Sequence, residues 1–371
     1  MSTILTIDDF DPLFVYSDYT AWETPNPQDH PTWWNASQAE TGSIWHQATY
    51  HYTTQVGTTV SLNFTGSGIT LLGAGGPSGT NYTVTLDPTS AQPFTQSYTT
   101  PNATDGRTVL FNTDGLSAGK HTLEIENLGS GLLVDLAVIN LDLGTPGAEL
   151  TNTTVQNDDP KIQYSGDWTT QNGPNFSGGT STYTSGQKSS FNFSFQGSAL
   201  YIYGDQVNDH GYYSIYLNGT DAEHLYGRYT GRSGCGGGYA KSCEKLHGLV
   251  GFAGGLPEGK HQVTLVNESP SESGGNVTFF DFDYLEYTVP SQYLFTSNTS
   301  ATASCPFANC TSSTTSPSAG SGPSISTHSS SGTISASAAA SSSGGAGMSM
   351  GDGMGLLGLT VGAWVLRKVL G

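Results

Sequence analysis

Basic side chains are the scarcest feature of this 371-residue chain. It has eleven Lys and Arg against thirty Asp and Glu, which gives a formal net charge of −19. So few cations cannot neutralise the phosphates of DNA or RNA, and a nucleic-acid partner is excluded. The acidic surplus is instead typical of a soluble surface that anionic membranes repel.

Helical periodicity is also lacking. Residues 1–290 contain no apolar stripe with a period near 3.6, and Thr, Ser, Tyr, Val and Gly dominate them. Residues 60–64 and 191–195 alternate between apolar and polar side chains instead. This pattern predicts β-strands separated by many turns.

Cysteine is rare, and its four residues form two close pairs in the sequence. We predict that Cys235 bonds to Cys243 and that Cys305 bonds to Cys310, as short disulfide clips of an oxidising compartment. The alternative is a zinc site, but neither pair has a two-residue spacing or a nearby pair of histidines. A secretory leader is not recognised either, because Asp8 interrupts the start before any apolar run develops.

Asparagine, by contrast, is concentrated in one context: twelve of the nineteen lie in Asn-x-Ser/Thr sequons. This excess predicts a glycosylated, extracellular protein. Asn63 and Asn192 fall within expected strands, and Asn267 is closely followed by proline, so these three are expected to be unused. The predicted acceptors are Asn35, Asn81, Asn102, Asn152, Asn175, Asn218, Asn276 and Asn298.

The first 290 residues repeat one pattern twice. Residues 52–73 match residues 183–204 without a gap, and residues 115–121 return as 255–261. A period of about 140 residues is the size of a whole domain. In the opening segments we pair Asp8 and Asp9 with Asp158 and Asp159.

The expected fold is all-β, with two tandem antiparallel jelly-roll β-sandwiches. A disordered Ser-rich stalk and a short apolar segment follow them. The expected boundaries are 1–147 and 148–290 for the sandwiches, 291–352 for the stalk and 353–371 for the apolar segment.

The apolar segment is shorter than the roughly twenty residues that span a bilayer. It fits the tail of a glycolipid-anchor signal, whereas Arg367 and Lys368 at its end favour a short stop-transfer segment. Either form would attach the folded part to a membrane or wall. The alternative is an unstructured tail without an anchor.

The repeated motifs resemble a known family. They run Tyr-Ser…Trp, Tyr-Thr…Phe-x-Gly-Ser…Gly and Gly-Leu-x-x-Gly-Lys-His…Asn, and a closing Asp-rich strand ends with Leu285. This string is similar to the galactose-binding-like β-sandwich ectodomains of fungal cell-surface proteins, over residues 4–290. The first copy departs from it by an insertion at residues 25–40 and by lacking the Asp-x-Asp ending. The resemblance implies carbohydrate binding at the cell surface.

Two clusters are candidate ligand sites. Trp33, Trp34 and Trp45 in the first copy offer indole faces for stacking on sugar rings, although a Pro-rich plug over the sandwich end would also use them. In the second copy, cations and tyrosines surround the clip between Cys235 and Cys243, and they suit an acidic glycan. The alternative is that these cations balance the protein's own carboxylates. The residues of this second cluster are Arg228, Tyr229, Arg232, Tyr239 and Lys241.

Aspartates open and close each copy. In related sugar-binding sandwiches such residues share a structural calcium ion, so they are candidate metal ligands here. The alternative is turn capping by Asp before proline. The candidate ligands are Asp8, Asp9, Asp135, Asp158, Asp159, Asp281 and Asp283.

No catalytic motif stands out. Glycosidases need two carboxylates across a cleft, and no pair here can be separated from turn residues. We therefore expect no enzymatic activity and no cofactor other than the candidate calcium. The expected function is recognition of carbohydrate or cell-wall polysaccharide, with membrane attachment through the C-terminal segment. The alternatives are a structural or adhesive surface protein without a small ligand, and a glycan hydrolase with its site at the domain junction.

Overall fold

The computed structural model describes residues 2–23, 45–76, 79–100, 107–206, 209–231, 245–268 and 279–295. In these ranges the fold is all-β and its sheets are antiparallel, which confirms the predicted fold class. Helical residues within the same ranges form only three short 3₁₀ turns.

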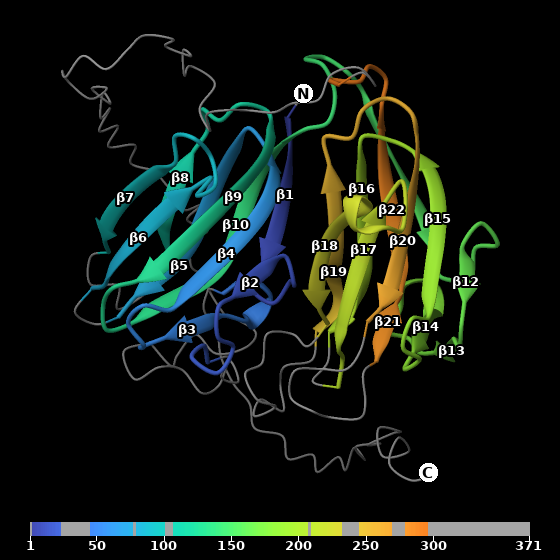
Figure 1. The fold of residues 1–371 in the computed structure, drawn as a ribbon, viewed down its shortest axis with the longest axis horizontal. Helices are drawn as coiled ribbons and strands as arrows, with labels where there is room; N and C mark the ends of the chain where they lie inside the picture. Colours follow the sequence, from blue (N-terminus) through green and yellow to red (C-terminus); the bar gives the residue numbers. More distant parts are fainter. Residues whose placement is uncertain are drawn as a thin grey trace, which may run out of the picture. The chain divides into compact units, whose positions relative to one another are not determined.

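Ten strands of the first half form two sheets (Figure 1). One has the order β1-β10-β5-β8, with β3 also pairing with β10, and the other has the order β2-β4-β9-β6-β7. The strands are β1 (Ser2–Asp8), β2 (Phe14–Tyr16), β3 (His51–Thr53), β4 (Thr59–Gly66), β5 (Gly68–Gly75), β6 (Asn81–Leu86), β7 (Phe94–Thr99), β8 (Thr108–Thr113), β9 (Gly119–Asn127) and β10 (Leu132–Asp142).

The described strands of the second half form three sheets. Their orders are β11-β22-β16-β19, β12-β15-β20-β17-β18 and β13-β14-β21. The strands are β11 (Leu150–Gln156), β12 (Gln163–Ser165), β13 (Thr169–Asn172), β14 (Thr180–Thr184), β15 (Ser190–Gln196), β16 (Ala199–Gln206), β17 (Tyr212–Leu217), β18 (Leu225–Thr230), β19 (Lys245–Gly254), β20 (Lys260–Asn267), β21 (Phe280–Phe282) and β22 (Tyr284–Pro290).

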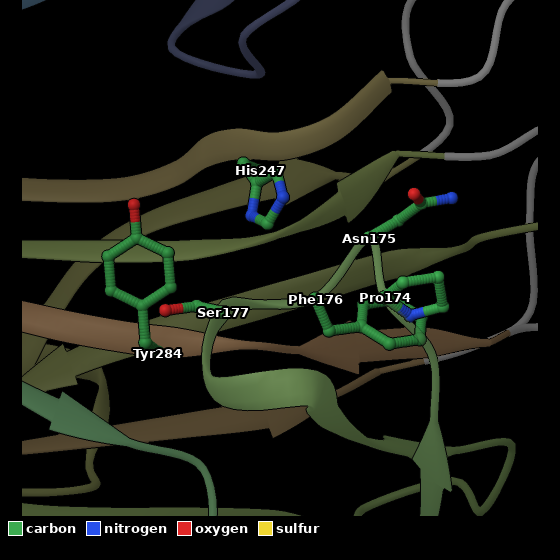
Figure 2. A pocket seen from close by; sticks show the side chains of 6 residues that line it. All are labelled: Pro174, Asn175, Phe176, Ser177, His247 and Tyr284. Carbon is green, nitrogen blue, oxygen red and sulfur yellow. The ribbon is translucent and has the colours of Figure 1, made fainter.

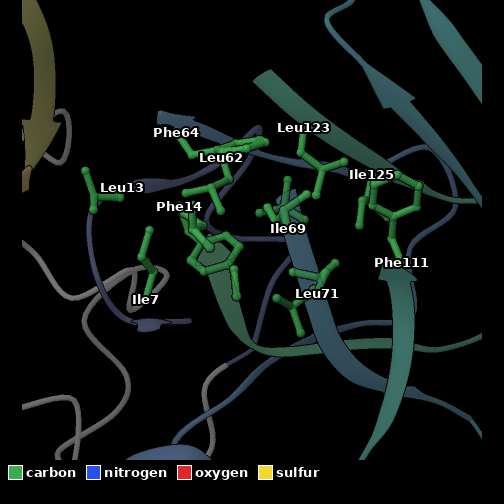
Figure 3. Packing of buried hydrophobic residues seen from close by; sticks show 14 of the residues in the cluster. Ile7, Leu13, Phe14, Leu62, Phe64, Ile69, Leu71, Phe111, Leu123 and Ile125 are labelled. Atoms are coloured by element: carbon green, nitrogen blue, oxygen red, sulfur yellow. The ribbon is translucent and has the colours of Figure 1, made fainter. Parts of the chain in front are cut away.

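Alternation along the strands builds the core of each half. In β4, Leu62 and Phe64 are buried while Asn63 between them is exposed, because successive side chains of a strand face opposite ways. Figure 3 shows Leu62 and Phe64 among side chains of the neighbouring strands, including Ile69 and Leu123. Burial of each such side chain stabilises the folded chain by about 1.5–3 kcal/mol.

The two halves are in contact within one compact unit of the chain. Tyr201, Leu249 and Phe252 of the second half belong to the same hydrophobic cluster as the core of the first half. Lys245 adds a polar contact, since its ammonium lies 2.9 Å from Asp8 Oδ2 and 2.8 Å from Asp11 Oδ1.

The opening segments of the two halves align differently from the sequence prediction. The Tyr16 hydroxyl donates to the carbonyl of Asp9 at 2.9 Å, and the Tyr164 hydroxyl donates to the carbonyl of Asn157 at 2.7 Å. Asp9 therefore corresponds to Asn157, not to Asp159. Both segments contain two adjacent aspartates, but the hydrogen bond of the tyrosine hydroxyl shows which residues are equivalent.

No helix among the described residues is long and apolar enough to cross a bilayer. Residues 296–371, which hold most of the predicted stalk and all of the predicted apolar segment, lie outside the described ranges.

Candidate functional site

An open pocket of about 610 Å³ lies in the second half, beside the 3₁₀ turn η4 (Ser177–Gly179) (Figure 2). Three separate segments form it: the chain leading into η4, the start of β19 and the start of β22. The lining residues are Pro174, Asn175, Phe176, Ser177, His247 and Tyr284.

His247 is held in the pocket by a buried carboxylate. Its Nδ1 lies 2.8 Å from Asp283 Oδ2, and the side chain of Asp283 is 2% exposed whereas that of His247 is 42% exposed. The same carboxylate accepts the backbone N–H of Ser177 at 3.0 Å. With Nδ1 directed at Asp283, Nε2 is the ring nitrogen left for a ligand.

The backbone of His247 is strained. Its φ is 56°, in the left-handed region that residues other than glycine rarely adopt. Such conformations cost about 1–3 kcal/mol and cluster at functional sites. The strain is therefore consistent with a histidine that is placed for a ligand.

Tyr284 supplies an aromatic wall. Its ring stacks on Tyr203 at a centroid distance of 4.5 Å, and its centroid is 6.4 Å from that of His247. Burial raises the pKa of Tyr284 to about 12, so its hydroxyl stays neutral and can both donate and accept hydrogen bonds. Phe176, half-buried just before η4, is the second aromatic side chain of the pocket.

A second polar cluster lies close to Asp283 in the same half. Asp281 accepts from Gln171 Nε2 at 2.7 Å and from Ser181 Oγ at 3.1 Å. Burial and the nearby charge of Asp205 raise the pKa of Asp281 to about 7. Burial alone would lower the pKa of His210, but Asp205 at 2.8 Å from its Nε2 raises it to about 10.

The aspartates that open the first half already contact basic side chains of the protein. Lys245 contacts Asp8 and Asp11, and His51 Nδ1 lies 2.6 Å from Asp9 Oδ2. Burial raises the pKa of Asp9 well above its usual range. These carboxylates therefore already have partners that would compete with a metal ion.

The remaining candidate metal ligands are dispersed or paired. Arg107 Nη1 lies 2.8 Å from Asp135 Oδ2, Asp158 is exposed and Asp159 is half-buried. Across the part of the chain that the structure describes, no three or more His, Cys, Asp or Glu side chains are grouped to hold a metal ion.

Of the candidate aromatic and basic residues, the three that the structure describes do not line the pocket. Trp45 is 3% exposed and packs on Tyr50 at a centroid distance of 5.4 Å, so it forms no open platform for a sugar. Arg228 lies over the ring of Tyr212 at 4.4 Å, and Tyr229 is half-buried against Tyr213. Outside the described ranges lie Trp33, Trp34, Arg232, Tyr239 and Lys241, as well as Cys235, Cys243, Cys305 and Cys310.

Of the eight predicted glycosylation sites, four lie within the described residues and four lie outside them. Asn81, Asn152, Asn175 and Asn218 are exposed, and Asn175 lines the pocket. Asn35, Asn102, Asn276 and Asn298 lie outside the described residues.

Sequence reasoning missed the pocket itself. Phe176, His247 and Tyr284 come from three segments that are far apart in the chain and carry no shared motif. One signal was present, because an aspartate recurs near the closing strand of each copy as Asp135 and Asp283. The sequence pattern predicts a metal ligand at these positions, whereas the two carboxylates contact Arg107 and His247.

Comparison with known proteins gives a limited result. No family model matches the chain. A protein named "A type blood alpha-D-galactosamine galactosaminidase", from Flavonifractor plautii, is 25% identical over 180 residues. The matched part is 48% of this chain and 15% of that protein. The chain therefore has weak similarity to a small part of one carbohydrate-active protein.

Similar solved structures have low scores. A family two carbohydrate esterase from Cellvibrio japonicus is 17% identical over 39% of this chain and 38% of its own, with a TM-score of 0.26. The ANX2 ectodomain from Arabidopsis thaliana is 11% identical over 78% of this chain and 97% of its own, also with a TM-score of 0.26.

The curated relative corrects one prediction. From the sequence we expected a protein without enzymatic activity, but this relative is named as a glycoside hydrolase, which points toward an enzyme. The prediction that the chain is not an enzyme is therefore wrong. The prediction was based on the lack of a carboxylate pair that could be distinguished from turn residues.

Proposed function

We propose that this chain recognises carbohydrate at the pocket of Phe176, His247 and Tyr284, within a protein that acts on glycans. One observation carries the proposal: two aromatic side chains and a half-exposed imidazole, oriented by a buried carboxylate, line one open pocket. Ligand sites combine apolar walls with a few fixed polar groups in this way.

Each group has a role in the proposed site. The rings of Phe176 and Tyr284 contact the apolar C–H face of a sugar ring, while the Tyr284 hydroxyl and His247 Nε2 bond to its hydroxyl groups. Asp283 fixes the orientation of the imidazole, so little entropy is lost when the sugar binds. Asp283 is therefore a positioning residue.

The proposed sugar class is galactose-like, and includes amino sugars. The name of the curated relative contains galactosamine, although this chain spans 15% of that protein. An amino sugar is positively charged near neutral pH, and a net charge of −19 would favour its approach to the protein. Methyl α-D-galactoside, methyl α-D-galactosaminide and methyl α-D-glucoside form a suitable probe panel.

The binding test compares the wild type with His247→Ala by isothermal titration calorimetry on that panel. Loss of oriented hydrogen bonds to the imidazole should weaken binding of the galactose-type probes at least about tenfold. His224→Ala is the matched control, since His224 is also a partly exposed histidine of the second half but lies outside the pocket. Equal loss in both variants, or no loss in His247→Ala, would contradict the proposal.

The curated relative favours a second candidate, which is hydrolysis of a galactosaminide. Release of nitrophenol from 4-nitrophenyl α-D-galactosaminide measures it directly. Turnover that His247→Ala abolishes would place the reaction at the pocket. Turnover that is unchanged in His247→Ala would place the reaction elsewhere.

The location of the protein is part of the proposal. Abundant sequons support an extracellular, glycosylated surface, and the Ser-rich and apolar C-terminal residues support attachment to a membrane or wall. The resemblance to fungal cell-surface ectodomains agrees with this placement. Mass spectrometry of secreted protein would identify glycans at exposed sequons such as Asn81 and Asn152.

A further inference from the structure

The first half contains a counterpart of the carboxylate in the pocket. The carbonyl of Asp135 accepts the N–H of Asp9 at 2.9 Å, and the carbonyl of Asp283 accepts the N–H of Asn157 at 3.0 Å. Since Asp9 and Asn157 are equivalent in the duplicated fold, Asp135 and Asp283 are equivalent too.

The turn that contacts this carboxylate is also duplicated. His46 N–H donates to Asp135 Oδ1 at 2.8 Å, as Ser177 N–H does to Asp283 Oδ1 at 3.0 Å. His46 opens the 3₁₀ turn η3 (His46–Ala48), and Ser177 opens η4. The central residue of each turn has a positive φ, 52° in η3 and 66° in η4.

The side chain that contacts each carboxylate comes from an equivalent strand position. Thr108 of β8 pairs with Gly73 of β5, and Gly248 of β19 pairs with Gly204 of β16. Gly73 and Gly204 match in the repeat, so the preceding residues, Arg107 and His247, are equivalent. Arg107 Nη1 lies 2.8 Å from Asp135 Oδ2, as far as His247 Nδ1 lies from Asp283.

Exposure separates these pairs from a structural ion pair. Lys245, which joins the two halves, has a side chain that is 5% exposed. Arg107 and His247 are 32% and 42% exposed, although their carboxylates are 0% and 2% exposed. Each pair therefore presents one outward polar group on a buried support.

We propose that the first half has a second glycan site, centred on Arg107 and supported by Asp135 and His46. This inference rests on the proposed function of the pocket. The planar guanidinium offers several N–H donors in a fixed fork, which suits two neighbouring oxygen acceptors of a sugar. Such a pair is provided by vicinal hydroxyls or by the carboxylate of a uronic acid. The wild-type chain then binds two sugars, one through an imidazole and one through a guanidinium.

Equilibrium dialysis of the full chain counts the sites. The probes are methyl α-D-galactoside, which offers hydroxyls alone, and methyl α-D-galacturonide, which adds a carboxylate. The expected result is two bound sugars per wild-type chain and one per chain in His247→Ala. Arg107→Lys keeps the positive charge but loses the forked arrangement of N–H donors. It should therefore weaken sugar binding at the Arg107 site about tenfold.

The outcomes distinguish the two proposals. One bound sugar in the wild type and none in His247→Ala would overturn the second site and leave the pocket standing. No binding of either probe to a folded wild type would overturn both. Loss in Arg107→Lys for the galacturonide alone would assign the second site to acidic sugars, and loss for both probes would assign it to hydroxyl pairs. A matched thermal midpoint for Arg107→Lys and wild type shows that folding is unchanged.

Discussion

Among single residues, the buried carboxylates dominate the response to pH. Burial raises the pKa of Asp135 and of Asp281 to about 7, whereas an unfolded chain has an ordinary aspartate value. Between about pH 4 and pH 7 the folded chain therefore holds more protons than the unfolded chain. Its stability must fall as the pH rises through this range.

Asp135→Asn should flatten that dependence. The wild type is expected to be more stable at pH 5 than at pH 8, with Asp135 contributing about 3 kcal/mol to the difference. Free energies of unfolding from urea titrations at the two pH values measure it. Asp114→Asn, at an exposed site of the same half, is the control. A slope that Asp135→Asn leaves unchanged would show that Asp135 is ionised in the folded chain.

Asn175 connects glycosylation with binding. It is an exposed sequon residue that lines the pocket, at the end away from Tyr284 (Figure 2). A glycan there would obstruct entry, so protein from a glycosylating host should bind galactoside more weakly than the same protein after enzymatic deglycosylation. Asn175→Gln should remove the difference, while Asn152→Gln, at an exposed sequon in β11, should keep it. Calorimetry on the three proteins, each before and after deglycosylation, measures these differences.

Among the elements, strands were predictable where alternation is strict. Residues 60–64 and 191–195 lie within β4 and β15, because one face of each strand is buried. The pocket was not predictable, because η4, β19 and β22 meet only through tertiary pairing. The positive φ of His247 could not be predicted from the sequence either, because a histidine does not indicate this conformation.

Close strand contacts give an element-level prediction. A Cβ at Gly73 in β5 would lie 2.0 Å from the carbonyl oxygen of Leu133, so the strands would have to separate. Gly73→Ala should destabilise the chain by about 3 kcal/mol. Gly76→Ala is the control, because its nearest neighbour would be 3.7 Å away. Equal urea midpoints for both variants would show that the strand pair adapts without cost.

In the whole molecule, Lys245 links the folding of the two halves. Burial alone would lower its pKa, but the charges of Asp11 and Asp8 raise it above the ordinary lysine value. Lys245→Met would leave two buried carboxylates without their cation, and should cost about 3–5 kcal/mol. We also expect its unfolding to become broader or to split in two, as the halves lose a shared contact.

Differential scanning calorimetry measures this effect. Lys188→Met, in a turn of the second half, is the control. A triple variant with Asp8→Asn, Asp11→Asn and Lys245→Met should recover part of the loss, since no buried charge remains unpaired. A Lys245→Met variant as stable and cooperative as the wild type would show that apolar packing alone couples the halves.

The Lys245 contact also determines which solution conditions can weaken the contact between the two halves. The cation of this contact is a side chain of the protein and not a bound ion, so every copy of the chain contains it. Chelators and low divalent-ion concentrations do not act on it, and salt screens such a buried pair much less than an exposed one. The contact between the two halves therefore does not depend on the supply of ions in the surroundings.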